Sequence, residues 1–375
     1  MNNVDAVVIG VGGVGSAALM HLARRGLKVV GFEQHATPED AAHDRGSSHG
    51  GTRVIRKAYG EGGAYVPLLE RAYELWRELE RDSGTPLLHL AGCLNIGPPA
   101  HEFIRGVLAS AREHHLPHEV LSAGELHARF PLFVPAPGDV AVFEQDAGLL
   151  AVEACTRAHV RLALQHGAEL RRERVLSVQL GHDDVTVTTD RGSLRATRVV
   201  VAAGPWWHTQ PWLQELGSTL VVRRQVQCWF PEPKQPRVMP CFIHLVDATR
   251  SFYGLPAFDG LGPKVCQHKG GAVTTADTVE RATSDADSDP VREYLRAHLP
   301  ELDAPPERRK TCLYSMTPDE HFLVGALPGK PVVVLGGFSG HGFKFASVLG
   351  ELAADLVQRG TSPFDLRAFD PLRFV

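Results

Sequence analysis

The residues near the start of the chain that are best suited to do chemistry are three glycines and a carboxylate. Gly10, Gly12 and Gly15 follow the apolar run Val7–Ile9, and Glu33 ends the next apolar stretch. In such a pattern the first glycine permits a tight turn, the second lets a pyrophosphate approach the backbone, and the third lets a helix pack closely on its strand. A carboxylate at the position of Glu33 accepts hydrogen bonds from a ribose diol and repels a 2′-phosphate. The pattern predicts a site for an adenine dinucleotide, NAD or FAD, and the alternative is a tight turn that binds no ligand.

Several basic residues form a second group of candidates. Arg53 and Arg56 lie one turn apart in a segment with several glycines, as expected for a loop that lies close to a ligand. Paired arginines are more often solvated surface charges, and their spacing alone favours that interpretation. Lys264 and His268 flank a short apolar stretch, and Lys344 lies just inside the last predicted helix. None of these three is distinctive by itself.

A second glycine-rich loop covers residues 336–342. Ser339 is followed by Gly340 and then by His341, so the loop does not match the GxSxG pattern of a nucleophile elbow. The loop leads from an apolar strand into a helix, and it is either a helix N-terminus that faces a ligand or a plain strand-to-helix turn. For a flavin ligand, the positive end of the helix would suit the N1–C2=O edge, where negative charge gathers on reduction. The sequence leaves both interpretations open.

Composition and charge exclude several classes of partner. The chain has 375 residues, and its 39 basic and 43 acidic residues are interspersed, with a net charge of −4. This distribution gives no footprint for nucleic acid or for an acidic membrane surface. The six cysteines are widely spread without a CxxC pair, so neither a disulfide framework nor a metal site is expected. We also expect no signal peptide and no membrane span, and therefore a cytoplasmic protein.

The elements that must position these residues follow from the hydrophobic pattern. Apolar residues at helical spacing predict helices over residues 14–25, 65–81, 151–165 and 343–358. Continuous apolar runs predict buried strands over 28–32, 199–204 and 332–335. Patterns of period two predict a small antiparallel meander over 175–188 and further strands, broken by proline and glycine, over 219–268.

These elements predict an α/β chain of two domains. Parallel-strand segments occur at both ends and in the middle of the chain, so we expect a discontinuous Rossmann-like dinucleotide domain with a mostly antiparallel β domain inserted into it. We place the dinucleotide-binding domain at residues 1–85, 148–217 and 313–375. The substrate domain then covers residues 86–147 and 218–312.

Taken together, several segments resemble one known family. Besides the N-terminal glycine turn, these segments are residues 50–62, 253–256, 311–322 and 337–345. On them the chain resembles the monomeric sarcosine oxidase and N-methyl-tryptophan oxidase family of FAD-dependent amine oxidases, and the likeness extends over nearly the whole chain. Residues 345–351 are more similar to the N-methyl-tryptophan oxidases than to the sarcosine enzymes.

The resemblance implies an FAD cofactor that is covalently attached. A thioether would join a cysteine to the 8α carbon of the isoalloxazine, and Cys312 occupies the position of that cysteine. The resemblance places Arg56 and Lys344 on the substrate carboxylate. It places Arg53 and Lys264 against the flavin, with the lysine at the face where oxygen is activated.

The residues implied by the motif and the resemblance fall into three groups. The catalytic candidates are Arg53, Lys264, His268 and Tyr253. The substrate-binding candidates are Arg56, Lys344 and Tyr314. The cofactor-binding candidates are Gly10, Gly12, Gly13, Val14, Gly15, Glu33, Ser47, Thr52, Val175, Gly204, Cys312, Gly340, Gly342, Phe343 and Lys344.

The reaction implied by the resemblance is the oxidative demethylation of an N-methyl amino acid, such as N-methyl-L-tryptophan or sarcosine, by a monomeric enzyme. O2 is the acceptor, and the products are the free amino acid, formaldehyde and hydrogen peroxide. Alternatives on the same scaffold are an oxidase of pipecolate or proline, or a dehydrogenase that passes electrons to a quinone. A nicotinamide-dependent dehydrogenase and a non-catalytic flavin-binding module are alternatives of other classes.

Overall fold

The computed structural model describes residues 3–37, 40–209 and 219–375, and these residues form three β-sheets. The eight-stranded sheet contains β1 (Asn3–Ile9), β2 (Val29–Glu33), β9 (Glu169–Arg172), β10 (Val175–Leu180), β11 (Val185–Thr189), β12 (Ser193–Val201), β19 (Leu323–Ala326) and β20 (Val332–Gly336). The nine-stranded sheet contains β5 (Cys93–Gly97), β6 (Glu119–Ser122), β7 (Val140–Glu144), β13 (Val221–Trp229), β14 (Cys241–Leu245), β15 (Ser251–Leu255), β16 (Lys264–His268), β17 (Val273–Thr274) and β18 (Arg308–Met316). A small third sheet contains β3 (Thr52–Ile55), β4 (Leu88–Leu90) and β8 (Gly148–Ala151).

Helices and short 3₁₀ turns connect these strands. The α-helices are α1 (Gly13–Arg24), α2 (Val66–Ser83), α3 (Glu102–Glu113), α4 (Ala123–Arg129), α5 (Val152–Gln165), α7 (Asp289–His298) and α8 (Ala346–Arg359). The 3₁₀ turns are η1 (Gly63–Tyr65), η2 (Gly204–Thr209), η4 (Asp285–Ser288), η5 (Pro300–Leu302), η6 (Phe343–Phe345) and η7 (Arg367–Phe369).

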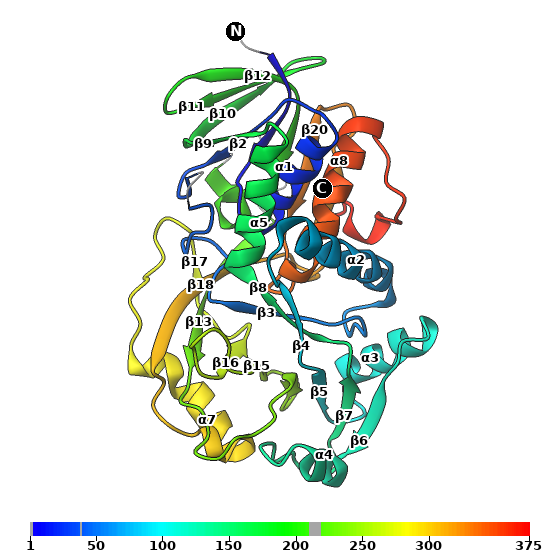
Figure 1. Ribbon diagram of the computed structural model, residues 1–375, viewed down its shortest axis with the longest axis vertical. Coiled ribbons are helices and arrows are strands. Elements are labelled where there is room, and N and C mark those ends of the chain that lie inside the picture. The colour runs from blue at the N-terminus through cyan, green and yellow to red at the C-terminus, as the bar shows by residue number, and fades with distance from the viewer. Residues whose placement is uncertain (1–2, 38–39, 210–218) are drawn as a thin grey trace.

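The eight-stranded sheet has a parallel centre in the order β9-β2-β1-β12-β20, with β19 antiparallel to β20 at the edge. Its strands come from three separate parts of the chain, and helices α1, α5 and α8 pack together beside it (Figure 1). A discontinuous sheet of this kind confirms the predicted α/β fold class, with a Rossmann-like unit interrupted by a second, β-rich one.

Strand β12 has two parts with different neighbours. Residues 193–196 pair antiparallel with β11, whereas residues 199–201 pair parallel with β20. The buried strand predicted at 199–204 is therefore the second part of a longer strand, which begins at Ser193 beside the meander and ends at Val201. Its first part alternates between buried and exposed side chains, and Val199, Val200 and Val201 are all buried, as expected where both faces of a sheet are covered.

The nine-stranded sheet is mostly antiparallel, as predicted, and β5 and β14 form a parallel pair within it. Leu94, Phe242 and Phe252 point from this sheet into a core that also contains Leu126 of α4 and Leu295 of α7. Because side chains alternate along a strand, the residues between them point to the opposite face. That opposite face forms one wall of the cavity described below.

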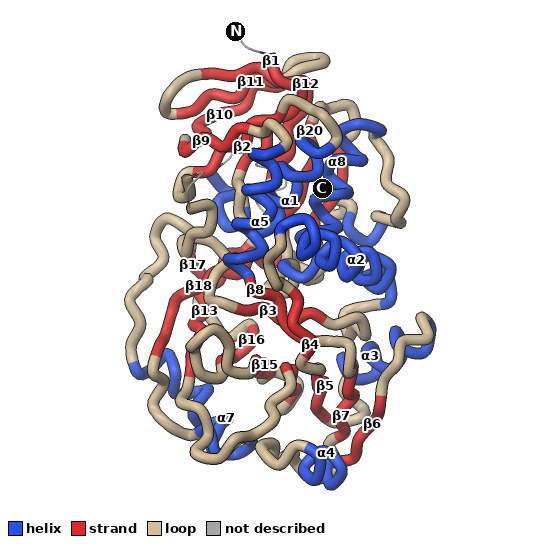
Figure 2. The backbone as a smooth tube through the Cα atoms, viewed as in Figure 1, coloured by secondary structure: helices blue, strands red, loops and turns tan. Residues whose placement is uncertain are grey.

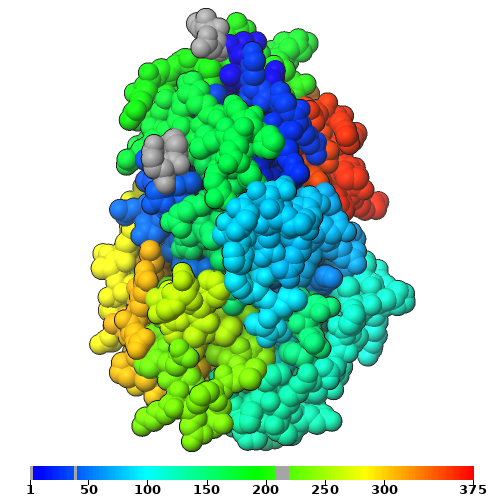
Figure 3. Space-filling model, viewed as in Figure 1, coloured from blue at the N-terminus to red at the C-terminus, as the bar shows by residue number. Residues whose placement is uncertain are grey.

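The three-stranded sheet and helix α2 lie between the two larger sheets (Figures 1 and 2). Helix α2 is amphipathic, and its buried face includes Leu68, Ala72, Leu75 and Trp76. This face packs against α8 and α5, while the other face of α2 is at the surface in Figure 3, in light blue.

The predicted helices agree with the structure except at the last one. The expected helix over 343–358 begins later, because residues 343–345 form the 3₁₀ turn η6 and α8 starts at Ala346. In this turn the carbonyl of Lys344 accepts a hydrogen bond from Nε1 of Trp76 at 2.9 Å, a long-range contact that no local pattern reveals. All six cysteines are buried with free thiols, and no described helix has the length and hydropathy needed to cross a membrane.

Candidate active site

In the glycine turn between β1 and α1, the three glycines of the motif, Gly10, Gly12 and Gly15, each have a different steric environment. A Cβ at Gly10 would lie 2.5 Å from the carbonyl oxygen of Ala202, and the residue has φ +84°. A Cβ at Gly15 would lie 1.8 Å from the carbonyl oxygen of Gly10, so the helix can pack this closely only with glycine. A Cβ at Gly12 would have nothing within 4 Å, and the open space beside it belongs to a cavity.

Glu33 lies at the end of β2, where the sequence predicts it, and its carboxylate already has partners. Its two oxygens accept hydrogen bonds from the backbone N–H groups of Val11 and His35, each at 3.0 Å. Burial opposes its charge, but these bonds and the nearby ring of His43 outweigh burial and lower the pKa of Glu33. Glu33 therefore holds the glycine turn in place, in addition to the ribose contact predicted for it.

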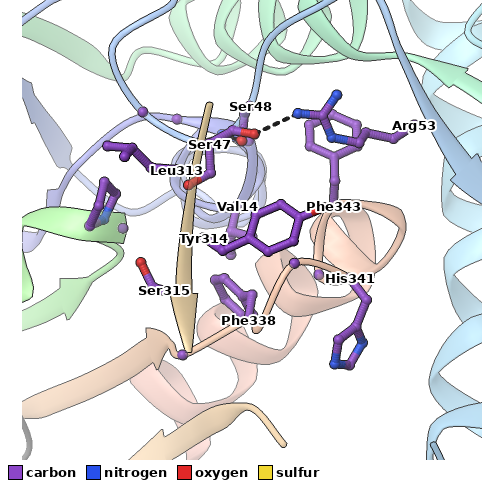
Figure 4. A pocket seen from close by; sticks show the side chains of 18 of the residues that line it. Val14, Ser47, Ser48, Arg53, Leu313, Tyr314, Ser315, Phe338, His341 and Phe343 are labelled. Atoms are coloured by element: carbon purple, nitrogen blue, oxygen red, sulfur yellow. Dashed lines mark hydrogen bonds between the residues drawn. The ribbon is translucent and has the colours of Figure 1, made fainter. Parts of the chain in front are cut away.

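A single cavity of about 750 Å³ begins at the glycine turn and continues to the arginines. The candidates that line it are Gly10, Gly12, Gly13, Val14, Glu33, Ser47, Arg53, Arg56, Val175, Gly204, Tyr253, His268, Tyr314, Gly340, Gly342, Phe343 and Lys344. Four candidates, Gly15, Thr52, Lys264 and Cys312, are not among the lining residues. Figure 4 shows part of the cavity, with the ring of Tyr314 near Phe338 and Phe343.

Lys264 is buried behind the loop that precedes β3 and does not face the cavity. Its ammonium donates hydrogen bonds to the carbonyl oxygens of Gly50 at 2.9 Å and Thr52 at 2.6 Å. Burial, together with the positive charge of Arg53, lowers the pKa of Lys264 to about 7. The lysine is thus close to its protonation equilibrium at neutral pH.

Cys312 lies beside Arg53 at the edge of the cavity. Its Sγ is 3.6 Å from Nη2 of Arg53 and 3.6 Å from the carbonyl oxygen of Ser47. Arg53 also donates to the carbonyls of Ser47 and Thr52, each at 2.8 Å, and Figure 4 draws the bond to Ser47 as a dashed line. The antiparallel register of β18 with β13, in which Cys312 lies opposite Gln225, fixes the position of the sulfur.

The wall formed by the nine-stranded sheet presents side chains in register. Leu245, Ser251 and His268 lie opposite one another on β14, β15 and β16, and Ile243 lies opposite Tyr253 two residues along. All five line the cavity. Sheet register therefore brings together residues that no sequence spacing relates.

His268 is a neutral polar group in this wall. Its Nδ1 lies 3.4 Å from the hydroxyl of Tyr314, and its ring packs edge-on to the ring of Tyr253. Burial, together with the nearby charge of Lys269, lowers the pKa of His268 to about 3. At neutral pH the imidazole can donate and accept hydrogen bonds but carries no charge.

Arg56 and Lys344 are buried in the lining of the same cavity, and Arg56 has an acidic partner that the sequence did not reveal. Nη2 of Arg56 lies 3.2 Å from Oε2 of Glu61. Burial raises the pKa of Glu61, but the charge of Arg56 outweighs it and brings the pKa to about 2. Burial and the charge of Arg56 lower the pKa of Lys344 to about 7. The pairing of Arg56 could have been suspected from the acidic residue five positions after it.

Comparison with known proteins identifies the family of this chain. Residues 5–356 match the family model described as FAD dependent oxidoreductase. The chain belongs to this family. It is 40% identical to a monomeric sarcosine oxidase from Streptomyces avermitilis, with 98% of this chain and 97% of the relative covered. It is 36% identical to an N-methyl-L-tryptophan oxidase from Citrobacter koseri, with 99% of each chain covered. The resemblance predicted from the sequence is confirmed.

Solved structures of the FAD-dependent oxidoreductase fold agree with this assignment. The open form of NikD, an unusual amino acid oxidase essential for nikkomycin biosynthesis, superposes with a TM-score of 0.85 at 26% identity, covering 99% of this chain and 98% of that one. L-proline dehydrogenase from P. horikoshii superposes with a TM-score of 0.83 at 21% identity, covering 100% of this chain and 98% of that one, and this likeness concerns the fold alone. Membership of the family decides between the two predicted dinucleotides in favour of FAD.

The residues of the cavity fit this cofactor. The open space at Gly12 and the N-terminus of α1, where the N-cap residue Gly12 has no side chain to cap the helix, suit a pyrophosphate. The ring of Tyr314 covers Gly340, where a Cβ would lie 2.3 Å from the ring and where φ is +83°. The loop 336–342 thus faces the cavity, which favours the interpretation as a ligand-facing loop over that as a plain turn.

Proposed function

We propose that this FAD-dependent oxidoreductase oxidises the N-methyl group of an N-methyl amino acid. The overall reaction consumes the amine, O2 and water and yields the free amino acid, formaldehyde and hydrogen peroxide. The observation that carries the proposal is the pair of buried cations, Arg56 and Lys344, in the same cavity as the glycine turn. The names of the relatives, monomeric sarcosine oxidase and N-methyl-L-tryptophan oxidase, support the same substrate class.

Arg56 and Lys344 are assigned to the substrate carboxylate. The guanidinium of Arg56 is planar and can bind a carboxylate through two parallel hydrogen bonds, once it exchanges Glu61 for the substrate. The ammonium of Lys344 adds a second charge from η6, which is far from Arg56 in the sequence. Together they orient the substrate so that its amine lies near the wall formed by Tyr253 and His268.

The same cations set the protonation of the substrate amine. Positive charge near an amine disfavours its protonated form, and the reaction needs the free lone pair on nitrogen. His268 is assigned as a polar neighbour of this amine and not as a strong base, because burial lowers its pKa to about 3. When bound, FAD would supply the oxidising chemistry, namely the acceptance of a hydride equivalent from the substrate and the transfer of electrons to O2. Arg53, which lines the cavity, and Lys264, which lies behind the loop that precedes β3, are assigned to provide positive charge near the place where negative charge gathers during the reaction.

We also propose that Cys312 holds the flavin covalently, through a thioether to the 8α carbon. The proposal is supported by the place of the thiol, which is 2% exposed and adjacent to Arg53 at the cavity edge. In Cys312→Ser, acid precipitation is expected to release the flavin into the supernatant, whereas the wild-type flavin stays with the protein. Release of flavin from the wild type would rule out the attachment.

An anaerobic titration tests the proposed reaction. The purified protein is titrated with sarcosine, N-methyl-L-tryptophan, pipecolate and proline while the visible spectrum of the flavin is recorded. Bleaching by an N-methyl amino acid, with hydrogen peroxide formed on readmission of air, is the expected result. Bleaching by pipecolate or proline alone would favour an imino acid oxidase, and reoxidation by a quinone but not by O2 would favour a dehydrogenase. A yellow protein that no amine bleaches would overturn the proposal in favour of a non-catalytic flavin-binding module.

The organisation of the protein is proposed on the same basis. Residues 1–85, 148–217 and 313–375 are assigned to an FAD-binding domain, and residues 86–147 and 218–312 to a substrate domain. The last boundary falls within β18, so this strand would contribute to both. We propose that the enzyme acts as a cytoplasmic monomer. The name of the monomeric relatives supports the oligomeric state, which sedimentation at micromolar concentration would test.

A further inference from the structure

A chain of hydrogen bonds leads from Lys344 to a loop at the rim of the cavity. The ammonium of Lys344 lies 3.3 Å from the hydroxyl of Tyr59. That hydroxyl lies 2.6 Å from Nδ1 of His341, and Nε2 of His341 lies 3.1 Å from the carbonyl oxygen of Glu320. Tyr59 and His341 belong to segments that resemble the family, but nothing in the sequence gives them a role.

The direction of every bond in this chain is determined. A carbonyl oxygen can only accept, so Nε2 of His341 must carry the proton that it donates to Glu320. Burial lowers the pKa of His341 to about 3, so the ring is neutral and its Nδ1 must accept. The hydroxyl of Tyr59 therefore donates to Nδ1, and its oxygen is left to accept from the ammonium of Lys344.

Tyr59 contacts both cations that are assigned to the substrate carboxylate. The guanidinium carbon of Arg56 lies 4.5 Å from the centre of the Tyr59 ring, and the hydroxyl of Tyr59 accepts a hydrogen bond from Lys344. The ring is fully buried and packs against Tyr65 and Phe345 at centre distances of 4.8 and 5.5 Å. Its position is thus set by packing and not by the ligand.

We propose that Tyr59 and His341 are positioning residues that hold Lys344 in the orientation in which it binds a carboxylate. The ammonium has three N–H groups. The described residues take two of them, through the hydroxyl of Tyr59 and the carbonyl of His341 at 2.6 Å, and the third is directed to the ligand. The proposal rests on the proposed function in one respect, namely that a carboxylate binds at Lys344.

The geometry also has a consequence for the charge of Lys344. A hydrogen bond to the charged form of a group favours that form. Loss of the Tyr59 hydroxyl therefore lowers the pKa of Lys344 below its value of about 7. The affinity for a carboxylate, which needs the ammonium, then declines at a lower pH than in the wild type.

The test compares Tyr59→Phe with Tyr65→Phe in the FAD-loaded enzyme. Tyr65 is the matched control, because it is also buried, packs against Tyr59 and loses a comparable bond, 3.0 Å to Nδ1 of His321, and no bond joins its hydroxyl to Lys344 among the described residues. The probe is acetate, which has a carboxylate but no amine, and its Kd is measured by calorimetry and by the flavin spectrum from pH 6 to pH 9. Tyr59→Phe is expected to weaken acetate binding at pH 6 by about tenfold, since a bond to a charged group is lost, and to shift the decline of affinity to lower pH. Tyr65→Phe is expected to change neither.

Variants of His341 keep the test decisive if Tyr59→Phe does not fold. In His341→Asn the amide oxygen can replace Nδ1 as the acceptor for Tyr59, whereas His341→Leu has no acceptor. The Asn variant is expected to retain most of the wild-type affinity and pH profile, and the Leu variant to behave as predicted for Tyr59→Phe. Equal behaviour of Tyr59→Phe and Tyr65→Phe, or equal behaviour of the two His341 variants, would overturn the proposal. Failure of the wild type to bind acetate at all would instead contradict the proposed function.

Discussion

Two parts of the cavity, the glycine turn and the buried cations, are built on different principles. At the glycine turn the contacts come from backbone groups and from the absence of side chains, and Gly10, Gly12 and Gly15 lie within a few residues of one another. At the cations the contacts come from buried charged side chains, and Arg56 and Lys344 come from segments far apart in the chain. The glycine turn depends on steric fit, whereas the cations depend on which charged and polar groups surround them.

The largest effects are expected from adding one methyl group at the glycine turn. In Gly15→Ala the new Cβ would lie 1.8 Å from the carbonyl oxygen of Gly10, so the turn or the helix must shift. Overpacking of this kind costs about 3 kcal/mol or more, and we expect little folded protein. In Gly12→Ala the Cβ meets no protein atom, so the apoprotein of this variant is expected to unfold at the same temperature as the wild-type apoprotein. The flavin content of the purified variant is expected to fall at least about tenfold.

Thermal unfolding and the flavin-to-protein absorbance ratio distinguish these two variants. If Gly12→Ala and Gly15→Ala lost stability to the same degree, the open space at Gly12 would not be the reason for its glycine. If both kept their flavin, the turn would not be the place where the pyrophosphate lies.

The next largest effect is expected at the Arg56–Glu61 pair, where removal of Arg56 and removal of Glu61 change acetate binding in opposite directions. Arg56→Met removes the guanidinium and is expected to weaken acetate binding by about 100-fold, because a charged hydrogen-bonding partner is lost. Glu61→Gln removes the carboxylate that competes for Arg56, and acetate is expected to bind about fivefold more tightly. Each variant is expected to lower the free energy of unfolding by about 2 kcal/mol, since each leaves a largely buried charge without its partner.

Glu102→Gln is a matched control, because Glu102 lines the same cavity outside this pair. It is expected to change neither acetate binding nor stability. Weaker binding of acetate to Glu61→Gln would mean that Glu61 supports the site and does not compete with the ligand, and the exchange assigned to Arg56 would then be wrong.

A pH-dependent effect, common to both parts of the cavity, is expected from buried neutral histidines. Burial lowers the pKa to about 3 for His21 and His159 in the helices near the glycine turn, and for His268 and His341 in the site. Each accepts a proton below about pH 6.5 when the chain is unfolded but not when it is folded, so stability is full above pH 6.5 and is lost as the pH falls. The slope for one such group approaches about 1.4 kcal/mol per pH unit.

Denaturant unfolding between pH 7 and pH 4 measures this slope. His159→Gln removes one of these groups that does not line the cavity. The slope of its stability against pH is expected to be smaller than the wild-type slope by the contribution of about one proton. An unchanged slope would show that His159 takes up its proton in the folded protein.

The glycine turn could be predicted from the sequence to a greater extent than the rest of the cavity. The glycine turn, Glu33 and the strand-helix-strand unit were predictable because the motif is contiguous and each residue acts through local geometry. The wall of the cavity was not, because Ile243, Tyr253 and His268 meet only through the register of β14, β15 and β16.

The partners of the cations were also beyond the sequence. Arg56 and Lys344 were candidates only through the family resemblance, since their spacing indicates surface charge as readily as a site. The hydroxyl of Tyr59 and the imidazole of His341 acquire a role only because η6 and the loop before it bring Lys344 beside residues from the other end of the chain. A hydrogen-bond chain across about 280 positions leaves no periodic signal.

The smallest effect is expected at the rim, where Lys269 and Glu320 form an ion pair that lines the cavity. This pair differs from Arg56–Glu61 in its solvation, because its side chains are 35% and 42% exposed. Exposed pairs contribute about 0–1 kcal/mol and are screened by salt. Lys269→Met is therefore expected to lower the free energy of unfolding by less than about 1 kcal/mol, with the difference vanishing in 1 M salt, and to leave acetate binding unchanged. If the free energy of unfolding fell by more than about 2 kcal/mol and the difference persisted in salt, the ion pair would act like a buried one. The carbonyl of Glu320 would then anchor His341 through that ion pair.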